Sequence, residues 1–189
     1  MSDLNGLAVA ILVTDGFEQV ELLQPREALR NAGADTAVVS PQSERVRGWN
    51  FTDWGDAVDV DVPLDRADPQ GFDALLLPGG VMNPDALRMQ PQAVAFVRAF
   101  FDAGKPVAVI CHGPWTVIEA GVARGRKIAS WPSLKTDLRN AGAQWVNQEV
   151  VIDGDLVSSR KPADIPVFNR AMVDVFGRAR HAHAARERF

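Results

Sequence analysis

The chain has 189 residues, of which 47% are hydrophobic and 23% are charged, and its formal net charge is -4. This length suits one well-filled core, and no change in composition divides the chain, so a single domain over residues 1–189 is predicted. The balance of charge excludes a general basic surface for nucleic acid or anionic lipid, and no apolar run is long enough to span a membrane. With one cysteine there is no internal disulfide, and a reducing cytoplasm is the expected location.

The predicted elements alternate between strands and helices. Residues 7–13 form an apolar run typical of a buried strand, and a helix is predicted over 17–31. The interleaved aromatic and polar residues of 45–62 favour a hairpin. Further strands are predicted over 36–40, 72–77, 107–110, 128–130, 145–152 and 156–159, and further helices over 92–103, 114–121, 134–141 and 163–176. Repeated β-α-β order indicates an α/β fold, a flavodoxin-like three-layer sandwich with a mostly parallel sheet and helices on both faces.

The C-terminal segment 178–189 is rich in Arg, His and Ala and is predicted to be a solvated extension of the domain. His181 and His183 within it are separated by one residue, which is poor spacing for a shared face of a helix. No metal site is therefore expected, and no cofactor is expected elsewhere in the chain.

The single cysteine lies where an apolar strand ends and a turn begins, in Val107-Ala108-Val109-Ile110-Cys111-His112-Gly113-Pro114. The first N–H groups of a following helix are unpaired and carry partial positive charge, which favours a thiolate over a thiol. Most lone cysteines are instead buried and inert. The strand-to-helix turn favours a nucleophile at Cys111, and His112 beside it supplies either a base or a backbone N–H group for an oxyanion.

Two other polar clusters follow predicted strands, Thr14-Asp15-Gly16-Phe17-Glu18 and Leu77-Pro78-Gly79-Gly80. Because ligands bind beyond the carboxyl ends of parallel strands, both clusters are expected to converge on Cys111. Gly79 and Gly80 form a tight turn or allow N–H groups to approach a substrate oxygen.

Glu18 is the acidic residue expected nearest to the thiol. An ionised carboxylate there would oppose the thiolate, whereas a protonated carboxyl would donate a hydrogen bond to it. The alternative is that Glu18 only complements a helix N-terminus. Asp85, in Asn83-Pro84-Asp85, is similarly either an exposed carboxylate at the start of a helix or the partner of a histidine.

The three clusters, in this order and at these separations, closely resemble the ThiJ/PfpI superfamily and specifically its branch of PfpI-type intracellular cysteine proteases and general stress proteins. The similarity extends over nearly the whole chain. It implies that Cys111 is the nucleophile, that His112 is the neighbouring histidine, and that Glu18 is the glutamate that hydrogen-bonds the cysteine.

The same resemblance implies that Gly79, Gly80 and Gly113 border the oxyanion and substrate site. It also implies that Asp85 of an adjacent subunit orients the histidine, so that the active unit is a homo-oligomer, at least a dimer. The chain departs from the family pattern here, since the acid is aspartate rather than glutamate and one extra residue lies between Gly80 and Pro84.

The function that the resemblance implies is a cytoplasmic, stress-protective cysteine hydrolase. Its substrate would be a small aldehyde, a glycated molecule or a peptide, because a thiolate can add to an aldehyde or to an amide carbonyl. The alternative is a non-catalytic redox sensor or chaperone in which Cys111 is oxidised and Glu18 hydrogen-bonds the product. A histidine oriented by Asp85 favours catalysis, since a sensor needs no oriented base.

Overall fold

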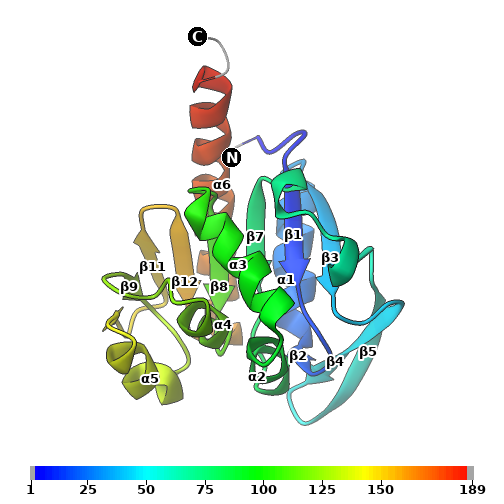
Figure 1. Cartoon of the computed structure of the whole chain (residues 1–189), viewed down its shortest axis with the longest axis vertical. Helices are drawn as coiled ribbons and strands as arrows, with labels where there is room; N and C mark the ends of the chain where they lie inside the picture. Colours follow the sequence, from blue (N-terminus) through cyan, green and yellow to red (C-terminus); the bar gives the residue numbers. More distant parts are fainter. Residues whose placement is uncertain (1–2, 187–189) are drawn as a thin grey trace.

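The computed structural model describes residues 3–186, with side chains from residue 3 to residue 178, and is built around a seven-stranded sheet (Figure 1). All neighbouring strands in this sheet are parallel except β11 and β12, which are antiparallel. In sheet order the strands are β11 (Val150–Asp153), β12 (Leu156–Ser159), β8 (Val107–Ile110), β7 (Ala74–Leu77), β1 (Ala8–Leu12), β3 (Asp35–Ser40) and β6 (Val62–Pro63). The predicted α/β class and mostly parallel sheet are confirmed.

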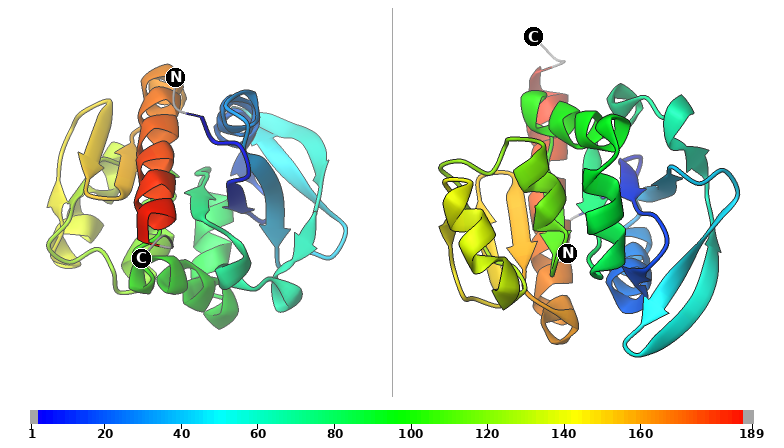
Figure 2. Two further views of the ribbon diagram at one scale, coloured as in Figure 1. Left: turned by 90° about the horizontal axis from the view of Figure 1, so that it is seen from above. Right: turned by 60° about the horizontal axis from the view of Figure 1, so that its bottom comes forward.

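Helices cover both faces of the sheet, as Figure 2 shows from two directions. One face packs against α1 (Gln19–Asn31) and α6 (Ile165–Arg186). The other packs against α2 (Met82–Arg88), α3 (Pro91–Asp102), α4 (Pro114–Glu119) and α5 (Lys135–Asn140). Short 3-10 turns occupy Leu64–Arg66, Pro69–Gly71, Pro132–Leu134 and Pro162–Asp164.

Alternation along the strands explains why two cores form. On β1, Val9 and Ile11 belong to the core beneath α1 and α6, whereas Ala10 and Leu12 belong to the core beneath α3 and α4. Successive side chains of a strand point to opposite faces, so a strand that is apolar throughout is buried on both sides. The central strands β7 and β8 are fully buried in this way.

Two small sheets flank the main one. The first is formed by β2 (Phe17–Glu18), β4 (Arg45–Asn50) and β5 (Asp53–Asp59), and the second by β9 (Lys127–Ile128) and β10 (Gln144–Trp145). The antiparallel β4–β5 pair confirms the predicted hairpin.

Several predicted boundaries were wrong. The first helix begins at Gln19 rather than at residue 17, because Phe17 and Glu18 pair with β4. The predicted strand 145–152 is two separate strands, β10 and β11, in different sheets. No range was predicted for helix α2, although Asp85 was a candidate for the start of a helix, since the sequence of α2 contains a proline and has no regular apolar period.

The last helix runs to Arg186 and extends beyond the body of the domain (Figure 1). Residues 187–189 and the side chains of residues 179–186, which include His181 and His183, lie outside the described part of the structure. No described helix is long and apolar enough to cross a membrane. Within the described residues, no cluster of three or more His, Cys, Asp or Glu side chains is arranged to hold a metal ion.

The loops that follow β1, β7 and β8 meet at one end of the sheet, as predicted from the parallel topology. Asn83 ties two of them together and is completely buried. Its Oδ1 accepts a hydrogen bond from Thr14 N at 2.8 Å, and its Nδ2 donates to the carbonyl oxygens of Pro78 and Gly79 at 3.1 and 3.0 Å.

Candidate active site

Cys111 occupies a sharp turn directly after β8. Its φ is 62°, which is the left-handed region that a non-glycine residue rarely adopts. The turn is held by two backbone hydrogen bonds, from Cys111 N to Ser159 O at 3.1 Å and from Trp131 N to Cys111 O at 2.9 Å. The predicted strand-to-helix elbow is therefore present, and its conformation is fixed by neighbouring β12 and by the loop after β9.

Glu21, rather than Glu18, supplies the carboxyl group beside the sulfur. Glu21 is 0% exposed, its carboxyl lies beside the Cys111 thiol, and its Oε2 accepts a hydrogen bond from Gly79 N at 2.8 Å. The prediction for Glu18 was wrong because Glu18 ends a short strand and precedes α1, so the side chain that reaches the sulfur comes from the first turn of the helix. Glu18 instead accepts a 3.4 Å hydrogen bond from Phe51 N, and it makes no side-chain cap of the helix.

The three glycines singled out in the sequence have different roles. Gly80 lines the pocket, and its N–H group faces the sulfur together with that of His112. The N–H group of Gly79 is already bound to Glu21, and that of Gly113 donates to Ile110 O at 2.9 Å. The N–H groups of Gly79 and Gly113 are therefore paired within the chain, and the place of these two residues beside an oxyanion and substrate site stays a prediction.

Close packing explains why Gly79 and Gly113 are glycines. A Cβ atom at Gly79 would lie 2.5 Å from Glu21 Oε2 and 2.7 Å from Cys111 Cβ. A Cβ atom at Gly113 would lie 2.7 Å from Leu77 O. These residues let the turns approach the nucleophile and the sheet closely.

His112 is an uncharged imidazole next to the thiol. Its Nδ1 lies 3.2 Å from Cys111 Sγ, and its Nε2 lies 3.4 Å from Ser133 Oγ. The ring is stacked on Trp131, with centroids 5.9 Å apart, and contacts Trp115 at 5.2 Å. Burial lowers the pKa of His112 from 6.5 to about 4, so the imidazole is uncharged at neutral pH and can accept a proton.

Protons in the site are shared between Glu21 and Cys111. Burial raises the pKa of Glu21 from 4.5 to about 8, against the opposing effect of its hydrogen bonds from Gly79 and Cys111. Burial, followed by the charge and the hydrogen bond of Glu21, also raises the pKa of the Cys111 thiol. Two adjacent anions repel each other, so the pair keeps at least one proton near neutral pH.

This result differs from the acidic thiol expected at a helix N-terminus. Helix α4 has only six residues, and Cys111 is only 6% exposed. Loss of hydration therefore outweighs the partial charge of a short helix and the N–H groups that face the sulfur.

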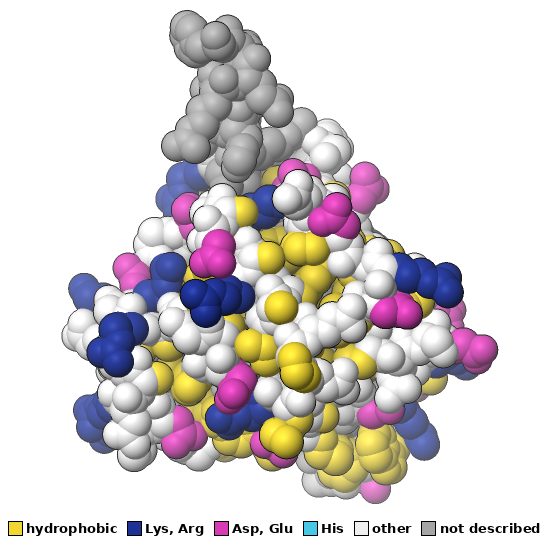
Figure 3. All heavy atoms as spheres, in the orientation of Figure 1, with side chains coloured by type: hydrophobic (Ala, Val, Ile, Leu, Met, Phe, Trp, Pro, Cys, Tyr) yellow, Lys and Arg dark blue, Asp and Glu magenta, His cyan; other side chains and the backbone are white. Residues whose placement is uncertain are grey.

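The sulfur lies in a pocket of about 790 Å³. Its wall is mainly apolar and includes Trp49 and Trp54, whose rings meet edge to face at 5.6 Å, together with Phe51 at the tip of the β4–β5 hairpin. Phe51 and Trp54 are exposed, and Figure 3 shows hydrophobic side chains at the bottom of the molecule, where this hairpin ends. Val81, Met82, Trp131 and Lys161 also line the pocket.

Asp85 is exposed on α2, and no hydrogen bond or ion pair joins it to His112 within the described chain. The predicted role of Asp85 requires a second subunit, so the single chain does not test it.

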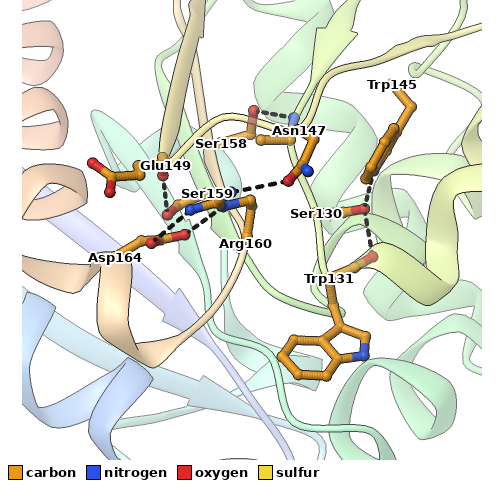
Figure 4. A network of polar contacts seen from close by, with 10 residues as sticks. Ser130, Trp131, Trp145, Asn147, Glu149, Ser158, Ser159, Arg160 and Asp164 are labelled. Carbon is orange, nitrogen blue, oxygen red and sulfur yellow. Dashed lines mark hydrogen bonds and ion pairs between the residues drawn. The ribbon is translucent and has the colours of Figure 1, made fainter.

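A polar network supports the site from the side of β12 (Figure 4). Arg160 donates two hydrogen bonds to Asp164, at 2.8 and 3.1 Å, and a third to Asn147 Oδ1 at 2.9 Å. Ser158 Oγ accepts from Ala129 N at 2.9 Å. These contacts fix the loop before α6 and the loop after β9, from which Lys161 and Trp131 enter the pocket.

The sequence patterns predicted neither Glu21 nor the aromatic wall of the pocket, which consists of Trp49, Phe51, Trp54 and Trp131. Glu21 has a detectable signal, because it shares the i, i+4, i+8 face of α1 with Pro25 and Leu29, which are both buried. A charged residue on such a face is a candidate functional group. The aromatic wall has no such signal, since it combines residues from β4, β5 and the segment after β9.

Comparison with known proteins agrees with the family that the sequence resembles. Residues 8–175 match the DJ-1/PfpI family. The chain is 44% identical over 167 residues to Deglycase TK1284 of Thermococcus kodakarensis, covering 88% of this chain and 98% of that protein. It is 41% identical over 167 residues to General stress protein 18 of Bacillus subtilis, covering 87% and 95% of the two chains.

The fold agrees as well. The crystal structure of Drosophila melanogaster DJ-1beta superposes with a TM-score of 0.80 at 25% identity, covering 97% of this chain and 98% of that one. The family match spans the elbow, Glu21 and the whole parallel sheet. This chain is a member of the DJ-1/PfpI family.

Proposed function

We propose that this protein is a stress-protective cysteine hydrolase that acts in the cytoplasm as a deglycase, removing carbonyl adducts from amino or thiol groups. The observation that carries the proposal is the contact of Cys111 Sγ with His112 Nδ1 at 3.2 Å, inside a pocket large enough for an adduct. The 44% identity with a protein named as a deglycase supports this substrate class over others.

The neutral imidazole begins the reaction. With the ring proton on Nε2 and directed to Ser133, Nδ1 of His112 accepts the proton of the Cys111 thiol. The adduct carbon that carries the amine or thiol also carries a hydroxyl, so loss of the amine or thiol, which takes up the hydroxyl proton, restores an aldehyde carbonyl. The thiolate then adds to this carbonyl carbon and forms a hemithioacetal. Glu21, protonated near neutral pH because burial raises its pKa to about 8, donates a hydrogen bond to the sulfur and stabilises its negative charge.

The negative charge that develops on the carbonyl oxygen needs hydrogen-bond donors. The N–H groups of Gly80 and His112 face the sulfur and support an oxyanion site of two donors. The histidine, now protonated, gives its proton to that oxygen, and water then replaces the sulfur on the carbon, which releases the hydrated aldehyde and regenerates the thiol.

The size of the pocket favours an adduct over a free small aldehyde. Pockets of roughly 300–1,000 Å³ enclose drug-sized ligands, and this one measures about 790 Å³. A three-carbon aldehyde would leave most of the apolar wall uncovered, whereas an adduct on a larger molecule can cover it.

The assay that tests the function compares three substrates, namely methylglyoxal, methylglyoxal-treated peptides and casein. We expect release of free amine from the treated peptides, and loss of that activity in Cys111→Ala. Equal or faster turnover of casein would support a peptidase instead. Turnover of methylglyoxal alone, with treated peptides left unchanged, would contradict the deglycase proposal.

The proposal includes a homo-oligomer in which Asp85 of one subunit approaches His112 of another. Asp85 is exposed, and it lies on the same helix as Met82, which lines the pocket. Mixing inactive Cys111→Ala with inactive Asp85→Ala should restore part of the activity, because some sites then contain both native residues. Subunit exchange is verified with a mass-tagged chain. Full activity of Asp85→Ala alone would exclude the shared site.

A redox-sensing function is less well supported by the site. Oxidation of a cysteine follows its thiolate character and exposure, and Cys111 is 6% exposed with a raised pKa. We therefore expect slow oxidation of the free protein by hydrogen peroxide. Complete oxidation at near-stoichiometric peroxide, without turnover of any adduct, would favour the sensor.

A further inference from the structure

One cationic residue lines the aromatic pocket. Among the described residues that line it, Lys161 is the only lysine or arginine. The residue is half-buried, and no hydrogen bond or ion pair of its ammonium group is found within the described part of the chain. The neighbouring Arg160 is different, because its guanidinium is already bound to Asp164 and Asn147.

The backbone of Lys161 is held in place by contacts on both sides. Its carbonyl oxygen accepts a hydrogen bond from Asp164 N at 2.9 Å, and Arg160 clamps the same aspartate (Figure 4). Pro162 follows directly and restricts the chain further. The ammonium group is therefore attached to a fixed point at the pocket, which limits the entropy lost when it binds a ligand.

The acidic side chains of the pocket approach the sulfur from the other side. Glu18 and Glu21 follow β1, whereas Lys161 follows β12, and in sheet order β8 with Cys111 lies between these strands. Glu21 is buried against the sulfur, and Glu18 is bound to Phe51 N. A ligand with its carbonyl at Cys111 thus meets carboxyl groups on one side and an unpaired cation on the other.

We propose that Lys161 is a specificity-determining residue, which binds a carboxylate or phosphate group of a substrate whose flat or apolar part packs on the aromatic wall. The inference rests on the proposed function in one respect only, namely that the bound anionic ligand is a substrate. Lys161 pairs with the anion, while Trp49, Trp54 and Trp131 contact the remainder of the molecule.

Binding can be tested without turnover, from the rate at which iodoacetamide alkylates Cys111. Two matched pairs of probes are used, indole-3-acetate with indole-3-acetamide for a carboxylate, and phenyl phosphate with phenol for a phosphate. We expect at least one anionic probe to protect the thiol at about tenfold lower concentration than its neutral partner, because a charge-assisted contact in a partly buried site is added. Which pair shows the preference identifies the anion.

Variants assign the preference to Lys161. Lys161→Met should remove it while leaving protection by the neutral probe unchanged, and Lys161→Arg should retain it. Lys127→Met is the matched control, since Lys127 is exposed and lies outside the pocket. A preference that survives in Lys161→Met would overturn the proposal, as would equal protection by anionic and neutral probes or no protection by any probe.

Turnover measured on the same variants separates the two proposals. Retained deglycase activity without an anion preference would contradict only the role of Lys161. An anion preference that depends on Lys161, in a protein that releases no amine from glycated peptides, would contradict only the deglycase function.

Discussion

Replacing Glu21 by glutamine should make the folded protein increasingly stable relative to the wild type as the pH rises above 4.5. The carboxyl is 0% exposed and its pKa is raised from 4.5 to about 8. An acid with a raised pKa binds its proton more tightly in the folded protein than in the unfolded chain. Below pH 4.5 both states are protonated and Glu21 costs no stability, whereas from pH 4.5 to about pH 8 the unfolded chain alone is ionised and the cost grows with pH. Each pKa unit corresponds to about 1.4 kcal/mol. Glutamine is neutral and has the same shape. The free energy of unfolding of Glu21→Gln, minus that of the wild type, should therefore be about 3 kcal/mol larger at pH 7 than at acidic pH.

Urea denaturation at fixed protein concentration from pH 5 to pH 8 measures this difference. Glu27→Gln is the matched control, because Glu27 lies on the same helix and is exposed. The free energy of unfolding of the control should follow the wild type at every pH. A constant difference between Glu21→Gln and the wild type across this range would show that Glu21 is already ionised in the folded protein. That result would refute its role as a proton donor to the sulfur.

Three further outcomes are expected. Gly79→Ala should destabilise the protein by about 1–3 kcal/mol and abolish turnover, because its Cβ would lie 2.5 Å from a buried carboxyl oxygen, whereas Gly71→Ala meets nothing within 4 Å and should leave both unchanged. Asp164→Asn should lower the free energy of unfolding by about 3 kcal/mol, because the Asp164 side chain is 4% exposed and pairs with an arginine. The control Asp102→Asn, in an exposed pair of the same spacing, should lower it by under about 1 kcal/mol, as measured by urea denaturation. On the acid side of its pH profile, kcat/KM should fall with a midpoint near pH 4, because this is the lowered pKa of His112. A midpoint near pH 6.5 would show that this imidazole is hydrated.

The fold could be predicted from sequence largely because its signals are local. The run 107–110 and the last four residues of the predicted strand 72–77, which are 74–77, are apolar at every position, which indicates strands buried on both faces, and the structure has strands there. The turn at Cys111 follows from the same pattern. Boundaries were less accurate where pairing decides them, as at Phe17 and Glu18, which join a sheet with β4 instead of opening the helix.

The turn that carries Cys111 and His112 could be located from the sequence, but the carboxyl group beside the sulfur could not. Glu18 and Glu21 are both acidic residues near the start of α1. They are three positions apart in the sequence, which is nearly one turn of a helix. Which of them reaches the sulfur depends on where the helix begins, and that is set by a contact with a strand about 30 residues away in sequence. The role of Asp85 could not be settled for a related reason, since a residue that acts across subunits has no partner within its own chain.

The arrangement of protons suggests how the nucleophile is kept inactive until substrate binds. In the free site Glu21 is protonated near neutral pH, His112 is neutral, and burial keeps the thiol protonated. Attack therefore requires transfer of the thiol proton to Nδ1 of His112, which creates an ion pair in a partly dry pocket. When the thiolate adds to a substrate carbonyl, its negative charge moves to the carbonyl oxygen, and the N–H groups of Gly80 and His112 can stabilise the charge there. A thiol activated by its own substrate reacts with carbonyl adducts while it resists unselective oxidation, which suits a hydrolase that must work under stress.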